Sequence, residues 1–308
     1  MTTATVRRPA RPAPKISRLE RWKLRGPLLP ALIFTLVLTQ IPFALTIIFS
    51  FSRWNLLSVS KQAFYFGENF VNAFTDHVFW QSILNTVVMT AAATVLCIAI
   101  GLGLGMLLNH AFPGRGVART LAITPFFMMP VAVTLFWKTA IFDPGFGFLG
   151  WISGTMGLPR ISWLSDYPMV SLIMFLTWRF APFALLILLA GLQGMPQDQL
   201  EASRVDGAGA LRQFRFIMLP HMRPFIELTA LLLAMNLLQT FGEIDILTAG
   251  GPAYATTNIT YYIYLKGFQS FDFGAASAYG VVALILTIAL ILPALRLLSG
   301  LFKKEGRV

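Results

Sequence analysis

The stretch EASRVDGAGALRQFRFIMLP, from Glu201 to Pro220, places charged residues and two glycines between two long apolar runs. The chain around it has 308 residues, of which 56% are hydrophobic and only 12% are charged. A soluble protein of this length has about a quarter of its residues charged, because they cover its surface. The composition therefore predicts a membrane protein with several spans, and the quoted stretch is a polar loop between two of them.

Apolar runs of about 20 residues, the length that crosses roughly 30 Å of hydrocarbon, recur along the chain. We expect an all-α polytopic membrane fold with six transmembrane helices, at 28–51, 82–109, 118–142, 167–192, 222–246 and 275–299. A tail over 1–27 precedes them, a loop over 193–221 joins the fourth to the fifth, and a tail over 300–308 follows. Pro125 and Pro130 predict kinks in the third span, and Pro182 predicts one in the fourth.

The basic residues indicate the orientation of these spans. Eighteen of the 24 lysines and arginines lie in the N-terminal tail, in or beside the connections at 110–117 and 193–221, and at the C-terminus, whereas five lie on the opposite side. By the positive-inside rule, both termini and the 193–221 loop are cytoplasmic. The net charge of +11 is thus a signal of topology, and we expect no nucleic-acid partner.

Helix signals divide the loop into two short helices. Pro196 opens a helix over about 197–205, the glycines of DGAG interrupt it, and Asp206 is suited to cap a second helix over about 208–218. Pro220 then starts the next span. Two interpretations remain: a turn whose apolar face rests on the membrane or on neighbouring spans, or a rigid element that inserts into a groove on a soluble partner.

Motifs of enzymes and of metal sites are missing from the sequence. No Gly-rich loop ends in Gly-Lys-Ser/Thr, and neither His-Glu-x-x-His nor Gly-x-Ser-x-Gly occurs. His77, His110 and His221 are too far apart in the predicted topology to form a metal site. Cys97 lies in an apolar run, where we expect a buried small side chain. The sequence therefore predicts neither an enzyme nor a metal site.

The loop resembles the signature loop of permease subunits of bacterial binding-protein-dependent ABC importers. Their pattern is E-A-A-x-x-D-G-A, then five residues and F-x-x-I-x-L-P. The matching positions are Glu201, Ala202, Asp206, Gly207, Ala208, Phe214, Ile217, Leu219 and Pro220, while Ser203 stands where the pattern has alanine. GGPAYATTN at 250–258, ENFVNAF at 68–74 and NTVVMT at 85–90 resemble segments of the sugar-importer branch, including maltose, polyol and glycerol-phosphate permeases, so the resemblance covers about 25–300.

This resemblance implies a type I permease fold in the bacterial inner membrane. It implies a subunit that passes a sugar, an oligosaccharide or a sugar alcohol across the membrane by alternating access. Its partners would be a second homologous permease, two cytoplasmic ATPases that bind ATP and Mg, and a periplasmic solute-binding protein, with no cofactor on this chain. The implied ATPase-coupling residues are Glu201, Ala202, Ser203, Arg204, Asp206, Gly207, Ala208, Phe214 and Pro220, with Glu201 contacting a basic group and Gly207 as the backbone break.

Polar residues inside spans are costly and indicate function. In the fifth span Asn236, Gln239, Thr240 and Glu243 recur at helical intervals and are predicted to share one face that lines the solute pathway. Aromatic residues of the fourth span could stack on the C–H face of a sugar; they are Trp178, Phe180 and Phe183. The alternative is that the polar face makes hydrogen bonds between helices that hold the bundle together.

Arg179 in the middle of the fourth span costs roughly 2.5–3.5 kcal/mol on insertion scales if it is unpaired. It pairs either with an acid such as Glu243, as a gate or packing element, or with an anionic group of the solute. The second possibility makes glycerol 3-phosphate an alternative solute. A stand-alone secondary transporter is a further alternative, but it requires a coupling-ion site of intramembrane carboxylates. Glu227 is expected to be a neighbour of Arg223 or of the loop.

Overall fold

The computed structural model describes residues 29–58, 64 and 66–303 of the chain. Its helices are α2 (Leu29–Ser50), α3 (Glu68–Thr75), α4 (His77–Asn109), α5 (Arg115–Phe127), α6 (Pro130–Phe136), α7 (Phe148–Thr155), α8 (Trp163–Asp166), α9 (Pro168–Gln193), α10 (Gln197–Val205), α11 (Ala210–Gln213), α12 (Leu219–Leu238), α13 (Gly242–Leu247), α14 (Ile259–Tyr264) and α15 (Phe273–Lys303). Three π-helical segments lie between them: η3 (Trp137–Ile141), η4 (Phe214–Met218) and η5 (Leu265–Gln269). These ranges contain only isolated β-bridges and no strand, so the all-α prediction is confirmed.

The chain divides into two compact units, one ending at Ile48 and the other beginning at Phe49. In the first unit, α2 is a 22-residue apolar helix that agrees with the span predicted at 28–51. The basic tail predicted at 1–27 lies outside the described residues. At the other end of the chain, α15 continues to Lys303, so the first residues of the tail predicted at 300–308 are helical.

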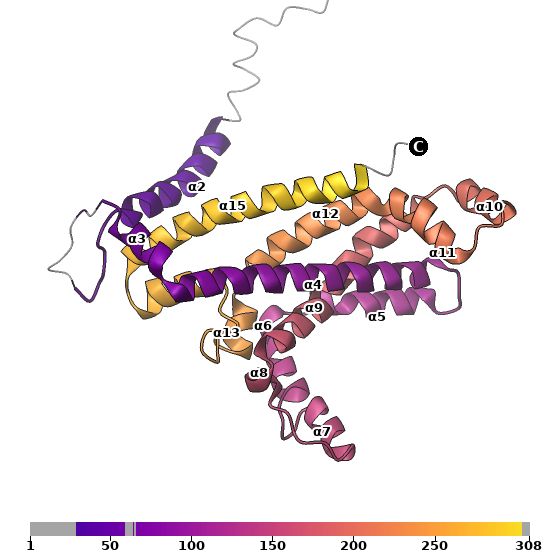
Figure 1. The fold of residues 1–308 in the computed structure, drawn as a ribbon, viewed down its shortest axis with the longest axis horizontal. Helices are drawn as coiled ribbons and strands as arrows, with labels where there is room; N and C mark the ends of the chain where they lie inside the picture. The colour runs from indigo at the N-terminus through magenta and orange to yellow at the C-terminus, as the bar shows by residue number, and fades with distance from the viewer. Residues whose placement is uncertain (1–28, 59–63, 65, 304–308) are drawn as a thin grey trace, which may run out of the picture. The chain divides into compact units, whose positions relative to one another are not determined.

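The core of the second unit is the packing of α4 on α9. A Cβ atom built on Gly101 of α4 would lie 2.8 Å from the Cβ of Ala184 and 2.9 Å from the backbone nitrogen of Leu185. Small residues at a helix interface let two backbones approach closely, which is the expected form of packing in lipid. Figure 1 shows α4, α12 and α15 extending in one direction, and α12 contacts both α4 and α9.

The third predicted span, 118–142, is not one helix. Arg115–Phe127 and Pro130–Ile141 meet at an angle of 99°. The break falls at Met128 and Met129, whose ψ values of 147° and 124° are extended. A proline disfavours helical conformation in the residue before it, so Pro130 is the cause, and it begins α6 itself. Pro125 remains inside α5 and Pro182 remains inside the continuous α9.

The fifth predicted span, 222–246, has both ends wrong. An apolar helical stretch runs without a break from Ala210 to Leu238, so Pro220 lies within this helix and does not start it. The π-helical segment η4 comes just before Pro220, which has no N–H to donate to a regular helical turn. The helix ends at Leu238, and the remainder of the predicted span contains the separate short helix α13.

Four helices of the described ranges are long and apolar enough to cross a membrane by length and composition. The bent pair of α5 with α6 and η3 makes a fifth if it is one span. The segment Phe273–Ala289 of α15 is apolar but shorter, and it begins the span predicted at 275–299. Six spans therefore stay a prediction.

Candidate functional site

The loop that matches the signature motif folds into a helix and a well-defined turn. α10 covers Gln197–Val205, as predicted. The backbone N–H of Ala208 donates to the carbonyl of Ser203 (2.9 Å) and that of Gly207 to the carbonyl of Arg204 (3.1 Å). With Gly207 at a φ of 77°, this is a Schellman motif, in which glycine adopts the left-handed conformation after the helix. The glycine therefore fixes the direction of the chain.

Ser203, the departure from the motif, is buried and satisfied. Its side chain is 8% exposed, and its hydroxyl donates to the carbonyl of Leu200 at 2.7 Å. Serine within a helix commonly satisfies its hydroxyl in this way. The substitution for alanine is therefore compatible with the same helix packing.

The predicted start of the second helix is wrong. α11 begins at Ala210 and its N-cap is Gly209, with no side-chain cap. Asp206 is instead the C-cap of α10, because the Schellman turn occupies the residues that would have led into a helix at 208. The side-chain amide of Gln213 donates to the carbonyl of Ala208 at 2.9 Å and ties the turn to α11.

The exposed surface of α10, α11 and the turn between them carries charged and apolar side chains together. Glu201, Arg204 and Asp206 are exposed, and the side chains of Val205 and Leu211 are 88% and 81% exposed. α10 and α11 lie at one end of the bundle, away from α3 and α13 (Figure 1). The same end carries the turn between α4 and α5. Phe214, by contrast, packs against the core of the bundle.

Arg179 forms an ion pair with Glu243, as one of the two sequence interpretations predicted. The guanidinium Nη1 of Arg179 donates to Oε1 of Glu243, and the two side chains are 10% and 12% exposed. Arg179 also lies over the ring of Phe180, at 5.3 Å from its centroid. The pair joins α9 to α13, so a solute that reaches Arg179 has to compete with a carboxylate.

The four polar residues of the fifth span do not share one helix face. Asn236 and Gln239 are exposed, whereas Thr240 is 4% exposed and Glu243 belongs to α13. The prediction assumed a continuous helix, and α12 ends at Leu238. The carbonyl of Thr240 accepts a hydrogen bond from the side-chain amide of Asn258 at 2.6 Å. The helical spacing of these four residues in the sequence therefore does not place them on one face, because the helix does not continue beyond Leu238.

The three aromatic residues of the fourth span are divided between two environments. Trp178 packs on Trp137, with ring centroids 5.1 Å apart, and both line an apolar groove of about 640 Å³ bordered by α4, α5 and α9. Phe180 and Phe183 pack on Phe126 of α5, at 6.2 and 5.3 Å. These contacts hold α9 against its neighbours, and the rings do not form one common platform.

The sequence interpretation missed a cluster around Asp76. Its Oδ2 accepts hydrogen bonds from the hydroxyls of Tyr262 (2.5 Å) and Tyr279 (2.9 Å), and the ammonium of Lys266 lies 3.4 Å away. Asp76 also caps α4 by accepting from the N–H of Val78 at 2.9 Å. Burial opposes the charged carboxylate, but the two hydroxyl donors and Lys266 outweigh burial and lower the pKa of Asp76.

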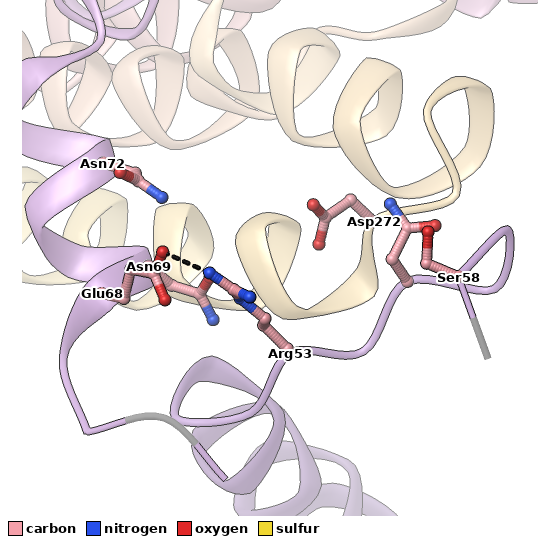
Figure 2. A pocket seen from close by; sticks show the side chains of 7 residues that line it. Arg53, Ser58, Glu68, Asn69, Asn72 and Asp272 are labelled. Atoms are coloured by element: carbon pink, nitrogen blue, oxygen red, sulfur yellow. Dashed lines mark hydrogen bonds and ion pairs between the residues drawn. The ribbon is translucent and has the colours of Figure 1, made fainter. Parts of the chain in front are cut away.

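A polar pocket of about 270 Å³ lies beside α3 (Figure 2). Its lining residues come from the segment after α2, from α3 and from the residue before α15: Arg53, Asn55, Ser58, Glu68, Asn69, Asn72 and Asp272. Arg53 pairs with Glu68 at 2.6 Å, the contact drawn as a dashed line in Figure 2. The amide of Asn69 donates to the carbonyls of Ser50 and Ser52. These bonds hold the segment after α2 against α3, and the N–H of Phe273 at the start of α15 donates to the carbonyl of Trp54 at 2.9 Å.

Two segments of the family resemblance contact each other. The side-chain amide of Asn85, in NTVVMT, donates to the carbonyls of Tyr254 and Thr257 at 2.9 and 3.0 Å. Within GGPAYATTN, the residues from Thr256 to Asn258 are fully buried, and the hydroxyl of Thr257 donates to the carbonyl of Gly250. A Cβ atom on Gly250 would lie 2.4 Å from the Thr257 hydroxyl oxygen. This loop is therefore a rigid, packed element.

The helical bundle, its apolar spans and its protruding helix–turn–helix loop define a multi-pass membrane transport component. Residues 98–304 match the family model described as binding-protein-dependent transport system inner membrane component, and the chain belongs to this family. It is 28% identical over 280 residues to the trehalose/maltose transport system permease protein MalF of Thermococcus litoralis, covering 90% of this chain and 93% of MalF. The chain is therefore the permease component of an ABC transport system of the inner membrane.

Two further comparisons agree with this assignment. The chain is 31% identical over 230 residues to the sn-glycerol-3-phosphate transport system permease protein UgpA of Yersinia pestis, covering 72% of this chain and 76% of UgpA. A chain of a bacterial ABC transporter involved in the import of the acidic polysaccharide alginate has the same fold, with a TM-score of 0.78, 21% identity and coverage of 94% of this chain and all of that one.

Proposed function

We propose that this chain is the permease subunit of an ATP-driven importer that passes a sugar, an oligosaccharide or a sugar alcohol across the inner membrane by alternating access. It works with a second homologous permease, a periplasmic solute-binding protein and two cytoplasmic ATPases that bind ATP and Mg and hydrolyse the ATP. Both termini and the α10–α11 loop face the cytoplasm, which the distribution of lysine and arginine supports. The family and the resemblance to MalF support the solute class.

The observation that carries this proposal is the direct connection between the loop and the bundle. α11 continues through η4 into α12 without a break, and α12 contacts α4 and α9. A force applied to α10 by a docked ATPase therefore acts on a membrane-crossing helix through a turn fixed by Gly207. Rigid-body movement of packed helices is one of the established ways to switch a protein between two states.

The pairing of Arg179 supports an uncharged solute. Its guanidinium is engaged by Glu243, and a phosphate that binds there must displace this carboxylate. Glycerol 3-phosphate stays the alternative because of the likeness to UgpA.

Proteoliposomes with the complete transporter, loaded with ATP, are expected to take up labelled trehalose or maltose. If the proteoliposomes take up glycerol 3-phosphate and no sugar, the solute is glycerol 3-phosphate and the proposed sugar class is wrong. Uptake without the ATPase subunits would contradict the whole proposal.

The role of the loop is tested by reversing one charge. Glu201→Lys is expected to abolish uptake while the complex still assembles, because the exposed carboxylate contacts a basic group of the ATPase. Asp198→Lys, on the same exposed helix, is the matched control and is expected to retain most uptake. Normal stimulation of ATP hydrolysis by the binding protein in Glu201→Lys would reject this contact.

A further inference from the structure

A cavity of about 450 Å³ lies between the segment that follows α6 and the loop that begins GGPAYATTN. Its walls come from η3, from α8, from the end of α13 and from Gly251 and Pro252. α8 and α13 lie away from α10 and α11, so the cavity is at the opposite part of the bundle from the proposed ATPase contact (Figure 1). None of its lining residues belongs to the coupling loop or to the predicted solute pathway.

The cavity is adjacent to the buried ion pair. One wall is Leu247, which lies one helical turn after Glu243 on α13. Another is Lys138, whose ammonium donates to the carbonyl of Ile246 at 2.6 Å and so connects η3 to α13. A molecule in the cavity therefore lies against the helix that carries Glu243, and movement of this helix changes both the cavity and the pair with Arg179.

The lining combines an apolar surface with donors and acceptors. Phe142 and Leu247 border the cavity but are buried, at 1% and 2% exposure, so its accessible apolar side comes from Pro144, Leu164 and Pro252. The hydroxyls of Ser162 and Ser165 make no hydrogen bond to any described residue. Asp143 uses Oδ1 to accept from the N–H groups of Gly145 and Phe146, so its second oxygen can accept from a ligand.

This chemistry fits an uncharged sugar. A sugar ring has apolar C–H faces and hydroxyl groups that both donate and accept, so it requires an apolar surface beside mixed polar groups. Lys138 and Asp143 carry opposite charges, and neither sign dominates the cavity. The volume lies within the range of roughly 300–1,000 Å³ that is common for small-molecule sites.

We propose that this cavity is a second sugar subsite, in which a sugar or polyol rests at the outer side of the bundle before it passes the Arg179–Glu243 pair. This inference rests on the proposed function, since it takes the solute class from there. The subsite holds the solute through Ser162, Ser165, Asp143 and Lys138, with the side chain of Leu164 against the C–H face of the ring.

Site-specific thiol labelling tests the proposal. The chain has one cysteine, Cys97, which is fully buried, so an introduced thiol is the only accessible one among the described residues. Ser165→Cys in the complete transporter in nanodiscs, without ATP, is reacted with a membrane-impermeant methanethiosulfonate. Trehalose or maltose at about ten times its Kd is expected to slow labelling of Ser165→Cys by about tenfold. Thr155→Cys, exposed on α7, is the matched control and is expected to label at an unchanged rate.

Uptake by the same preparations separates the possible failures. If Ser165→Cys takes up labelled sugar but its labelling rate is the same with and without sugar, the subsite is wrong and the proposed function stands. If the unmodified transporter takes up none of a panel of labelled sugars, oligosaccharides and sugar alcohols, the proposed function fails and the subsite with it. A second variant, Ser165→Trp, fills the cavity and is expected to raise KM for the sugar more than it lowers kcat; an unchanged KM would also overturn the subsite.

Discussion

At the scale of single residues, the pair of Arg179 and Glu243 shows how a charge is accommodated inside this bundle. Removing one partner of a buried pair costs about 3–5 kcal/mol, because the other charge stays buried without compensation. We therefore expect Arg179→Met and Glu243→Gln each to lower the Tm of the purified transporter strongly. The double variant is expected to be more stable than the sum of the two single effects predicts.

A second pair in the same chain provides the control. Arg223 and Glu227 lie four residues apart on α12, at 2.9 Å, and their side chains are 25% and 29% exposed. A pair of this kind contributes about 0.3–0.5 kcal/mol, so Glu227→Gln should hardly change the Tm. Equal losses in Glu243→Gln and Glu227→Gln, or strictly additive effects at Arg179 and Glu243, would show that the buried pair has no special role in stability.

The sequence could predict the partner of Arg179 because an intramembrane cation needs an acid and few acids are available in the spans. The same reasoning found that Glu227 is a neighbour of Arg223. It could not find the cluster of Asp76, because an aspartate before an apolar run indicates only a helix cap. Its hydroxyl donors lie 186 and 203 residues further along the chain, and no local pattern connects them.

At the scale of elements, the turn after α10 allows a comparison of two nearby glycines. Gly207 has a φ of 77° and Gly209 a φ of −67°, and a Cβ atom on either would meet no atom within 4 Å. Only Gly207→Ala is therefore strained, by roughly 1–2 kcal/mol in the left-handed conformation. We expect Gly207→Ala to reduce ATP-driven uptake severalfold and Gly209→Ala to leave it near the unmodified level. Equal uptake by the two variants would mean that the geometry of the turn does not matter for coupling.

The α4–α9 interface allows a second comparison. A Cβ atom on Gly101 would collide with Ala184 at 2.8 Å, whereas one on Gly103 would have open space. Gly101→Ala forces the two helices apart and is expected to lower the Tm by an amount that corresponds to about 1–3 kcal/mol, the usual cost of overpacking. Gly103→Ala replaces a helical glycine at an open position and is expected to leave the Tm unchanged or to raise it slightly. Thermal unfolding of both variants in detergent would decide, and a larger loss at Gly103 would contradict the assignment of the interface.

Helix ends were predictable where the signal is local, and were missed where the partner is distant. Pro196 and the glycines of DGAG fixed α10, and Pro130 marks the bend after α5. The end of α12 has no such signal, because glycine appears only at position 242. There the hydroxyl of Thr260 donates to the carbonyl of Leu238 at 3.1 Å, in place of the bond that a continuing helix would make. Contacts made by residues twenty positions later thus end the helix.

At the scale of the whole molecule, Asp76 connects parts of the chain that are far apart in sequence. It caps α4 and binds the hydroxyls of Tyr262 on α14 and Tyr279 on α15, with Lys266 of η5 beside it. The ring of Tyr279 also stacks on Phe79, with centroids 4.8 Å apart. These contacts join the ends of α4, α14 and α15 at one point, so that they can move as one body when the transporter changes state.

The pKa of Asp76 gives this cluster a pH dependence that can be measured. Although burial favours the neutral acid, hydrogen bonds from Tyr262 and Tyr279 and the charge of Lys266 hold the folded-state pKa below its ordinary value of 3.8. A carboxylate whose pKa is lowered by folding stabilises the folded protein. This stabilisation is fully present well above pH 3.8 and is lost as the pH falls through the folded-state pKa of Asp76. Asp76→Asn keeps a capping side chain but loses the charge. The Tm of this variant should therefore lie below that of the unmodified protein near neutral pH, and the difference in Tm should shrink below about pH 4. If the difference in Tm were the same at neutral pH and below about pH 4, the charged carboxylate would not be what holds the three helix ends together.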